Sequence, residues 1–308
     1  MDMTFLGTGG AWGLPELHCN CFICTEMRRK GEKRQRTSLL FSDGDTLLVD
    51  CGPDAKAQLV RHQVKSLSAV LVTHEHGDHY IGLDELFAYK RNTPKEAFSP
   101  IPLYLTGESW RVIAPRFDYL ERLGVIEVRM IEPGRRFFVG NFEILPFRTE
   151  HGAFAKGSVG YLITGPAAGG GKSRVLYTSD FMDIPEIHEQ MLEPDYLVVQ
   201  SFWLHEPLHN RPHHMSFQRA LEYIIRLNPR METFLVHMGD ADRVEGDPEN
   251  HQAKKYEPAD PLRPPSGGPA YPVPRNQQQW QETVDRILTD RKLAYRVTVA
   301  RDGKTVTI

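Results

Sequence analysis

The stretch that most constrains this chain runs from Thr73 to His79 and has the sequence Thr-His-Glu-His-Gly-Asp-His. An apolar, β-branched run over residues 67–72 precedes it and is typical of a buried strand. A helical pattern over residues 80–90 follows it. The histidines are therefore expected on a loop at the carboxyl end of a strand, where open α/β sheets place their ligand chemistry.

The chemistry of this loop predicts a metal site. Three imidazoles and a carboxylate are ligands that suit Zn²⁺, Mn²⁺ or Fe. His74 and His76 alternate with another residue, so they can reach one point in space. Asp78 and His79 come one step later and can serve a second point a few ångströms away. A solvated, histidine-rich loop is the plainer alternative.

A cysteine cluster near the start of the chain predicts a second metal site. Cys19, Cys21 and Cys24 place three thiols within six residues, and Cys51 stands apart. In a reducing compartment such a cluster favours a thiolate zinc site over disulfides. Three incidental thiols are the alternative, and a zinc site needs a fourth ligand from elsewhere. Cys51 is interpreted as a small buried hydrophobic residue.

Composition limits the classes of partner. The chain has 308 residues and a net charge of −3, from 37 basic and 40 acidic residues, so bulk charge does not indicate a nucleic-acid binder. A basic run at 28–36 is interpreted as a solvated helix end, with a phosphate-binding role near an active site as the alternative. The start of the chain lacks the basic and apolar regions of a secretory signal, and no apolar run would span a membrane. We expect a cytoplasmic protein without a membrane partner.

The remaining pattern alternates strands and helices. Residues 127–131, 136–139 and 142–146 are predicted to form a meander, and 294–300 with 305–308 a closing hairpin. Residues 241–275 are rich in proline and glycine and predict a long loop that acts as a lid or an interface arm. Further helices and strands are expected at 4–6, 38–41, 46–50, 55–62, 102–106, 108–123, 159–164, 174–178, 195–202, 217–227, 232–236 and 277–292.

His-x-His-x-Asp-His is the signature of the metallo-β-lactamase superfamily, which this chain resembles. The resemblance implies an α/β fold, a four-layer αβ/βα sandwich, with residues 1–308 as a single domain and an insertion at about 241–275. Within the superfamily, the cysteine motif is similar to that of the PhnP-type cyclic phosphate phosphodiesterases of the tRNase Z-like branch.

The resemblance also implies a set of site residues. Two divalent ions, Zn or Mn, would be held in the active site, one by His74, His76 and His151, the other by Asp78, His79 and His237. Asp180 would bridge the two ions, and Asp50 would accept a hydrogen bond from a ligating histidine. Asp78 and His214 would be catalytic, with His214 donating a proton to, or hydrogen-bonding, the phosphate or the leaving oxygen.

One departure from the family concerns the cysteine cluster. PhnP-like proteins take the fourth ligand of a structural zinc from a histidine three residues after the last active-site histidine, and this chain has Asp240 there. A carboxylate also ligates zinc, so Asp240 is the predicted fourth ligand. His18 is a rival with poor geometry, because it adjoins Cys19.

These inferences predict a metal-dependent phosphodiesterase that hydrolyses a small or cyclic phosphate diester with a metal-bridging hydroxide. The alternatives are a tRNA 3′-end nuclease, a thioester or lactone hydrolase, and a non-hydrolytic PqqB-like protein of cofactor biosynthesis. The expected partner is a small phosphate ester. Nucleic acid is not favoured, and a homodimer stays open.

Overall fold

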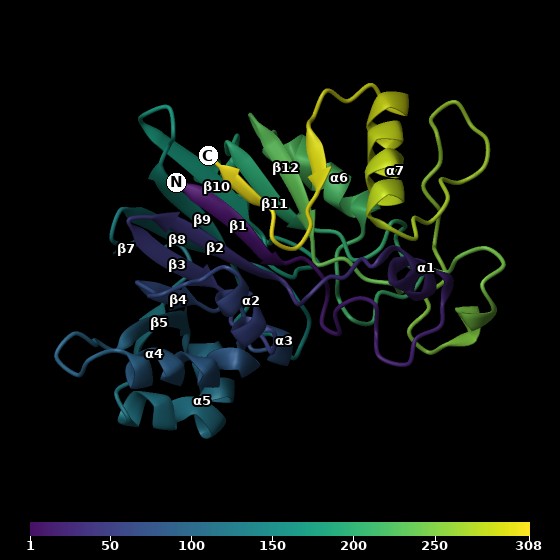
Figure 1. Cartoon of the computed structure of the whole chain (residues 1–308). Helices are drawn as coiled ribbons and strands as arrows, with labels where there is room; N and C mark the ends of the chain where they lie inside the picture. The colour runs from purple at the N-terminus through teal and green to yellow at the C-terminus, as the bar shows by residue number, and fades with distance from the viewer.

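Two seven-stranded sheets form the centre of the molecule in the computed structural model, which describes residues 1–308 (Figure 1). The first sheet has the order β14-β1-β2-β3-β4-β5-β6 and the second the order β13-β12-β11-β10-β9-β8-β7. The first sheet contains β1 (Asp2–Gly7), β2 (Ser38–Asp43), β3 (Asp45–Val49), β4 (Ala69–Leu71), β5 (Ile101–Thr106), β6 (Ile126–Ile131) and β14 (Thr305–Thr307). The second contains β7 (Phe137–Val139), β8 (Phe142–Arg148), β9 (Val159–Pro166), β10 (Lys172–Tyr177), β11 (Tyr196–Gln200), β12 (Glu232–Val236) and β13 (Val297–Val299).

Helices cover the outer face of each sheet. The helices are α1 (Phe22–Lys30), α2 (Ala55–Arg61), α3 (Gly77–Tyr80), α4 (Phe87–Asn92), α5 (Gly107–Arg122), α6 (Phe217–Leu227) and α7 (Gln277–Asp290), with short 3₁₀ turns at Ile81–Leu86, Glu189–Met191 and Pro248–His251. Ser216 caps α6 by accepting a hydrogen bond from the backbone N–H of Arg219, and Thr106 caps α5 in the same way through Ser109. These caps fix where each helix leaves the edge of its sheet.

Three separate apolar cores define four layers. One core of 24 buried residues lies between the sheets and includes Phe41, Tyr161 and Phe234. A second, of 27 residues, packs α6 and α7 against the second sheet. A third, of 19 residues, packs α2 and α5 against the first sheet. β4 is buried on both faces and is a continuous apolar run, because neither face meets water. The predicted αβ/βα sandwich is confirmed.

Two pairings expected from the sequence are wrong. β6 is the edge of the first sheet, parallel to β5, whereas β7 and β8 begin the second sheet, so the three strands form no meander. β13 pairs with β12 in the second sheet and β14 with β1 in the first, so the closing hairpin does not form either. In both places the chain crosses from one sheet to the other, and a local turn signal carries no information about which sheet supplies the partner.

Residues 241–275 form a long, mostly irregular segment, as predicted. Figure 1 shows it in lime green beside α1, and buried Val244 packs in one small apolar cluster with the cysteines at the start of that helix. Its only regular element is the short 3₁₀ turn at Pro248–His251, and two isolated bridges fix it locally. No helix of the structure combines the length and apolar character that crossing a membrane requires.

Candidate metal centre and active site

Loops at the ends of four strands bring the predicted metal ligands together. The histidine loop follows β4, His151 lies just beyond β8, Asp180 beyond β10 and His237 directly after β12. Because β3 and β4 are parallel neighbours, as are β10, β11 and β12, their carboxyl ends meet at one edge of the sandwich. Residues that are far apart in the sequence thus converge on one site.

The converging side chains form two adjacent groups. In each group the potential ligand atoms all lie within 4.8 Å of one another, and the groups are His74, His76, His151 and Asp78, His79, Asp180, His237. His76 and Asp78 are partly exposed, and the other five side chains are buried. These groups correspond to the two sets that the resemblance implies for two ions, with Asp180, the expected bridge, in the second group.

Asp180 Oδ2 lies at the centre of the site. It is 2.9 Å from His237 Nε2, 3.3 Å from His79 Nε2 and 3.8 Å from His151 Nε2. His79 Nε2 is also 3.1 Å from Asp78 Oδ2. Ligands about 2.1 Å from one ion at tetrahedral angles lie roughly 3.4 Å apart, so these separations suit a carboxylate that contacts both groups.

The site fits divalent cations because its buried polar atoms lack other partners. His74 Nε2, His79 Nε2, both ring nitrogens of His237 and Asp180 Oδ1 are buried without an aligned hydrogen bond. The close contacts of His79 and His237 with carboxylates therefore do not satisfy them. Buried polar atoms are rarely left unpaired, and several aimed at one point indicate a bound ion.

Asp50 orients the site from behind, as predicted. Its carboxylate accepts hydrogen bonds from His79 Nδ1–H at 2.7 Å, from the Thr73 backbone N–H at 2.8 Å and from the Thr73 hydroxyl at 3.0 Å. The proton on Nδ1 leaves His79 Nε2 free to bind an ion. Burial alone would lower the pKa of His79, but the carboxylates of Asp78, Asp50 and Asp180 together raise it well above its usual value. The raised pKa means that Nε2 also carries a proton when no ion is bound. A cation must displace this Nε2 proton, so ion binding releases protons.

His214 stands at the rim of the same site. Its Nδ1 is 2.7 Å from Gln200 Nε2 and 3.8 Å from Asp180 Oδ2, and its side chain is 10 % exposed. Gln200 Oε1 accepts from the backbone N–H groups of Phe181 and Met215, which fixes the amide so that Nε2 donates to the histidine. His214 Nδ1 is therefore an acceptor, and its proton sits on Nε2. Burial lowers the pKa of His214 well below its usual value.

Three residues of the site adopt a left-handed backbone conformation. Asp50, Ser179 and His237 have φ of 64°, 59° and 55°. Each follows a strand that ends at the site, and for non-glycine residues this conformation costs on the order of 1 kcal/mol or more. The packed strands hold these turns and aim the side chains beside them.

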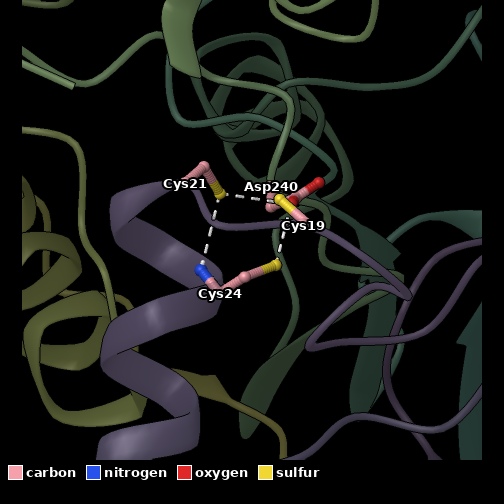
Figure 2. Close-up of side chains that lie close together, drawn as sticks. All are labelled: Cys19, Cys21, Cys24 and Asp240. Atoms are coloured by element: carbon pink, nitrogen blue, oxygen red, sulfur yellow. Dashed lines mark hydrogen bonds between the residues drawn. The ribbon is translucent and has the colours of Figure 1, made fainter. Parts of the chain in front are cut away.

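The three cysteines and Asp240 form a separate cluster (Figure 2). Their ligand atoms lie within 4.8 Å of one another, and all four residues are buried. Asp240 Oδ2 is 3.5 Å from Cys19 Sγ, 3.5 Å from Cys21 Sγ and 3.0 Å from Cys24 Sγ. Ligands of one tetrahedral zinc would lie roughly 3.5 Å apart, given Zn–S of about 2.3 Å and Zn–O of about 2.0–2.2 Å. His18 is exposed and outside the cluster, and Cys51 is buried in the core around α2.

Other histidines have structural roles. His205 bonds to Tyr271 O and to the Leu262 backbone N–H, and so anchors the 241–275 segment. His213 contributes its backbone carbonyl, 2.8 Å from His151 Nδ1. His209 is exposed and belongs to neither ligand group. Sequence reasoning missed Gln200 and Thr73, because a glutamine ending one strand and a threonine before a histidine carry no distinctive signal.

Two arginines of the basic run at 28–36 form hydrogen bonds and an ion pair within the fold. Arg34 is buried and bonds to Thr8 Oγ1 and Ala300 O, both at 2.7 Å, while Arg36 pairs with Asp54. A cavity of about 1040 Å³ lies between α2 and α4 and contains no histidine or cysteine in its lining. The side chains that could bind a metal ion therefore lie at the strand ends and not in that cavity.

Comparison with known proteins agrees with this geometry. Residues 45–238 match the family model of the Beta-lactamase superfamily domain. An octanoyltransferase of Porphyromonas gingivalis is 28% identical over 249 residues, covering 77% of this chain and 46% of that protein. The human zinc phosphodiesterase ELAC protein 1 is 33% identical over 88 residues, 28% of this chain and 20% of that protein. The chain thus spans less than half the length of these curated relatives.

Solved structures share the whole fold. A diphosphatase from the PhnP family superposes with a TM-score of 0.70 at 20% identity, covering 99% of this chain and 96% of that one. Zn²⁺-bound PqqB from Methylobacterium extorquens gives a TM-score of 0.68 at 18% identity and full coverage of both chains. The fold is that of β-lactamase-like proteins. The chain belongs to the β-lactamase superfamily, as the match over residues 45–238 shows.

Proposed function

We propose that the protein is a metal-dependent hydrolase, acting as one domain, that cleaves a small or cyclic phosphate diester. The observation that carries this proposal is the pair of ligand groups joined at Asp180 Oδ2, with His214 at the rim. The phosphodiester bond is favoured by the likeness to a relative named zinc phosphodiesterase and to a diphosphatase of the PhnP family.

Seven side chains would hold two cations, Zn²⁺ or Mn²⁺: His74, His76 and His151 for one, Asp78, His79 and His237 for the other, and Asp180 for both. Such ions lower the pKa of water to about 7 and polarise a phosphoryl oxygen.

The protein's own groups orient and transfer protons. Asp50 keeps His79 in the tautomer that leaves Nε2 free. When water attacks phosphorus and the bond to the leaving oxygen breaks, that oxygen needs a proton. His214 carries a proton on Nε2, since Nδ1 accepts from Gln200, and Phe202 stacks on its ring with centroids 4.4 Å apart. We assign His214 Nε2–H as the hydrogen-bond donor to that oxygen, and the attacking water supplies the proton that the oxygen takes up.

A screen of the purified protein tests the proposal. Bis(p-nitrophenyl) phosphate, 2′,3′-cyclic nucleotides and a phosphoribosyl cyclic phosphate should be hydrolysed with added Zn²⁺ or Mn²⁺, and chelation should abolish the reaction. A protein with both ion sites filled that hydrolyses none of these esters contradicts the phosphodiesterase assignment. A tRNA precursor cleaved with a steep salt dependence would instead favour a nuclease.

An acyl-thioester hydrolase is the second candidate, because a relative covering 77% of this chain is named octanoyltransferase. The same ions could polarise a thioester carbonyl. Hydrolysis of an octanoyl thioester faster than of any phosphate diester would favour this candidate.

A further inference from the structure

A lysine from the 241–275 segment contacts the cysteine cluster directly. Lys254 Nζ is 2.6 Å from Asp240 Oδ2 and 3.1 Å from Cys19 Sγ. Its outer side pairs with the Glu16 carboxylate at 2.5 Å. The lysine forms no hydrogen bond with Cys21 or Cys24 in the structure, so its ammonium lies beside the cluster and not between the four ligand atoms shown in Figure 2.

The charge of the cluster explains why an ammonium belongs there. Three thiolates and a carboxylate carry four negative charges, and a zinc ion neutralises two of them. Two uncompensated charges in a buried site are costly unless they are paired. A neutral histidine as the fourth ligand would leave only one. The carboxylate of Asp240 therefore creates a need for a cation close to it.

Other groups around the cluster also place positive charge or hydrogen-bond donors near it. Lys255 is buried and donates to the backbone carbonyls of Asp240 and Asp242, while Arg28 donates to the carbonyl of Cys19. The backbone N–H of Glu16 donates to Cys24 Sγ at 3.3 Å. Of the side-chain cations, Lys254 is the one that touches ligand atoms, because the other two bind backbone oxygens.

The segment around Lys254 is folded against the cluster. Asp247 Oδ2 accepts from the backbone N–H of Phe22 at the start of α1, at 2.8 Å. Val244 is buried with the three cysteines in one small apolar cluster. These two contacts anchor the segment to α1 and to the cysteines, and they hold Lys254 in its position.

We propose that Cys19, Cys21, Cys24 and Asp240 bind one zinc ion with Lys254 as its charge-compensating partner, so that the segment after residue 240 completes the metal centre. Lys254 is a positioning residue: its ammonium pairs with Asp240 Oδ2 and Cys19 Sγ and does not ligate the ion. The segment is then neither a lid nor a free interface arm over residues 244–255, because its role is to neutralise a carboxylate-containing zinc site.

Zinc-dependent protection of individual thiols tests this without any substrate. The full-length, zinc-loaded protein is equilibrated with a graded chelator and alkylated briefly, and mass spectrometry reads each cysteine separately. Cys51 is buried in a different core and reports global unfolding. Lys95→Met is the matched control, because Lys95 is exposed and makes no contact with the cluster.

Lys254→Met should lose protection of the three cluster cysteines at a free zinc concentration about 10–100-fold higher than the control, the usual effect of removing a partner of a metal ligand. Lys254→Arg, which keeps the charge, should stay near the wild type. Combining Lys254→Met with Asp240→His should restore most of the affinity, since a neutral fourth ligand leaves one uncompensated charge in place of two.

Three results would overturn the proposal. The first is a Lys254→Met midpoint equal to that of Lys95→Met. The second is an equal loss of zinc affinity when Lys254→Met is made in the wild-type protein and in the Asp240→His variant. If Lys254→Met alone unfolds the protein and exposes Cys51, this comparison still tests the proposal. The third is alkylation of the wild-type cluster at saturating zinc, which would mean that the ammonium, and no metal, balances the acidic groups.

Discussion

Replacing Asp50 with asparagine should disable one ion site while leaving the fold intact. Asp50 is fully buried, and its φ of 64° suits asparagine better than most residues, because asparagine tolerates the left-handed conformation. The variant keeps one oxygen to accept from the Thr73 N–H. It places an NH₂ group where Oδ2 now accepts from His79 Nδ1 at 2.7 Å.

That exchange reverses the hydrogen bond to His79. To avoid two facing donors, the ring must accept at Nδ1 and carry its proton on Nε2, the atom that points toward Asp78 and Asp180. A protonated Nε2 cannot ligate a cation. Loss of such an orienting partner typically lowers metal affinity about 10–100-fold, which corresponds to about 1.4–2.8 kcal/mol.

The measurement is metal content in graded chelator, followed by phosphodiester hydrolysis with and without excess metal. Asp50→Asn should lose one ion of the active-site pair early, and its rate should recover in part when metal is added. Asp260→Asn, an exposed change without contacts in the site, is the control. If Asp50→Asn retains both ions and its full rate as that control does, the tautomer argument is wrong.

Three further outcomes follow from the same contacts. Asp180→Ala should abolish most hydrolysis and release at least one ion, because Asp180 Oδ2 contacts both ligand groups; full metal content at full rate would refute the bridging role. His214→Ala should lower kcat about 10²–10⁴-fold with both ions retained, and less for a substrate with a good leaving group; an equal loss on both substrates would indicate phosphate positioning instead. Burial lowers the pKa of His205, so the unfolded chain takes up a proton first, and the stability this histidine contributes is present above its usual pKa of 6.5 and lost as pH falls through the folded value. Hydrogen exchange corrected for intrinsic rate should show the Leu262 amide losing protection as the pH falls below about 6.5, because protonated Nδ1 no longer accepts its hydrogen bond, and His205→Gln should show no such change.

The histidine loop was predictable from a local signal, because His74 follows a β-branched run that marks the end of a buried strand, and the ends of parallel strands share an edge. His151, Asp180 and His237 were predicted from the resemblance to the superfamily, since a single histidine or aspartate after a strand has no distinctive pattern of its own. The sheet that each strand joins was not predictable in the same way. β6 and β7 follow one another closely but belong to different sheets, and so do β13 and β14. The sheet that a strand joins depends on which face of the strand packs in the core between the two sheets.

Partners that act through contact alone could not be predicted either. Gln200 resembles any polar residue that ends a strand, and its relation to His214 depends on two backbone donors that fix its amide. Lys254 lies in an irregular segment, 235 residues from Cys19, and nothing in its sequence neighbourhood marks it. The departure from the family at Asp240 was visible, but its consequence, a need for one more positive charge, pointed to no particular residue.

The two centres are joined by one short loop, which gives the cysteine cluster a reason to lie where it does. His237 belongs to the candidate active site, and Asp240, three residues later, belongs to the cluster. Between them, a Cβ on Gly239 would lie 2.7 Å from the ring of Phe202, which stacks on His214. No side chain fits there, so the loop cannot shift without moving that ring. An ion bound at Asp240 would therefore also limit the movement of His237 and His214, because only four residues of backbone, 237–240, join the two centres.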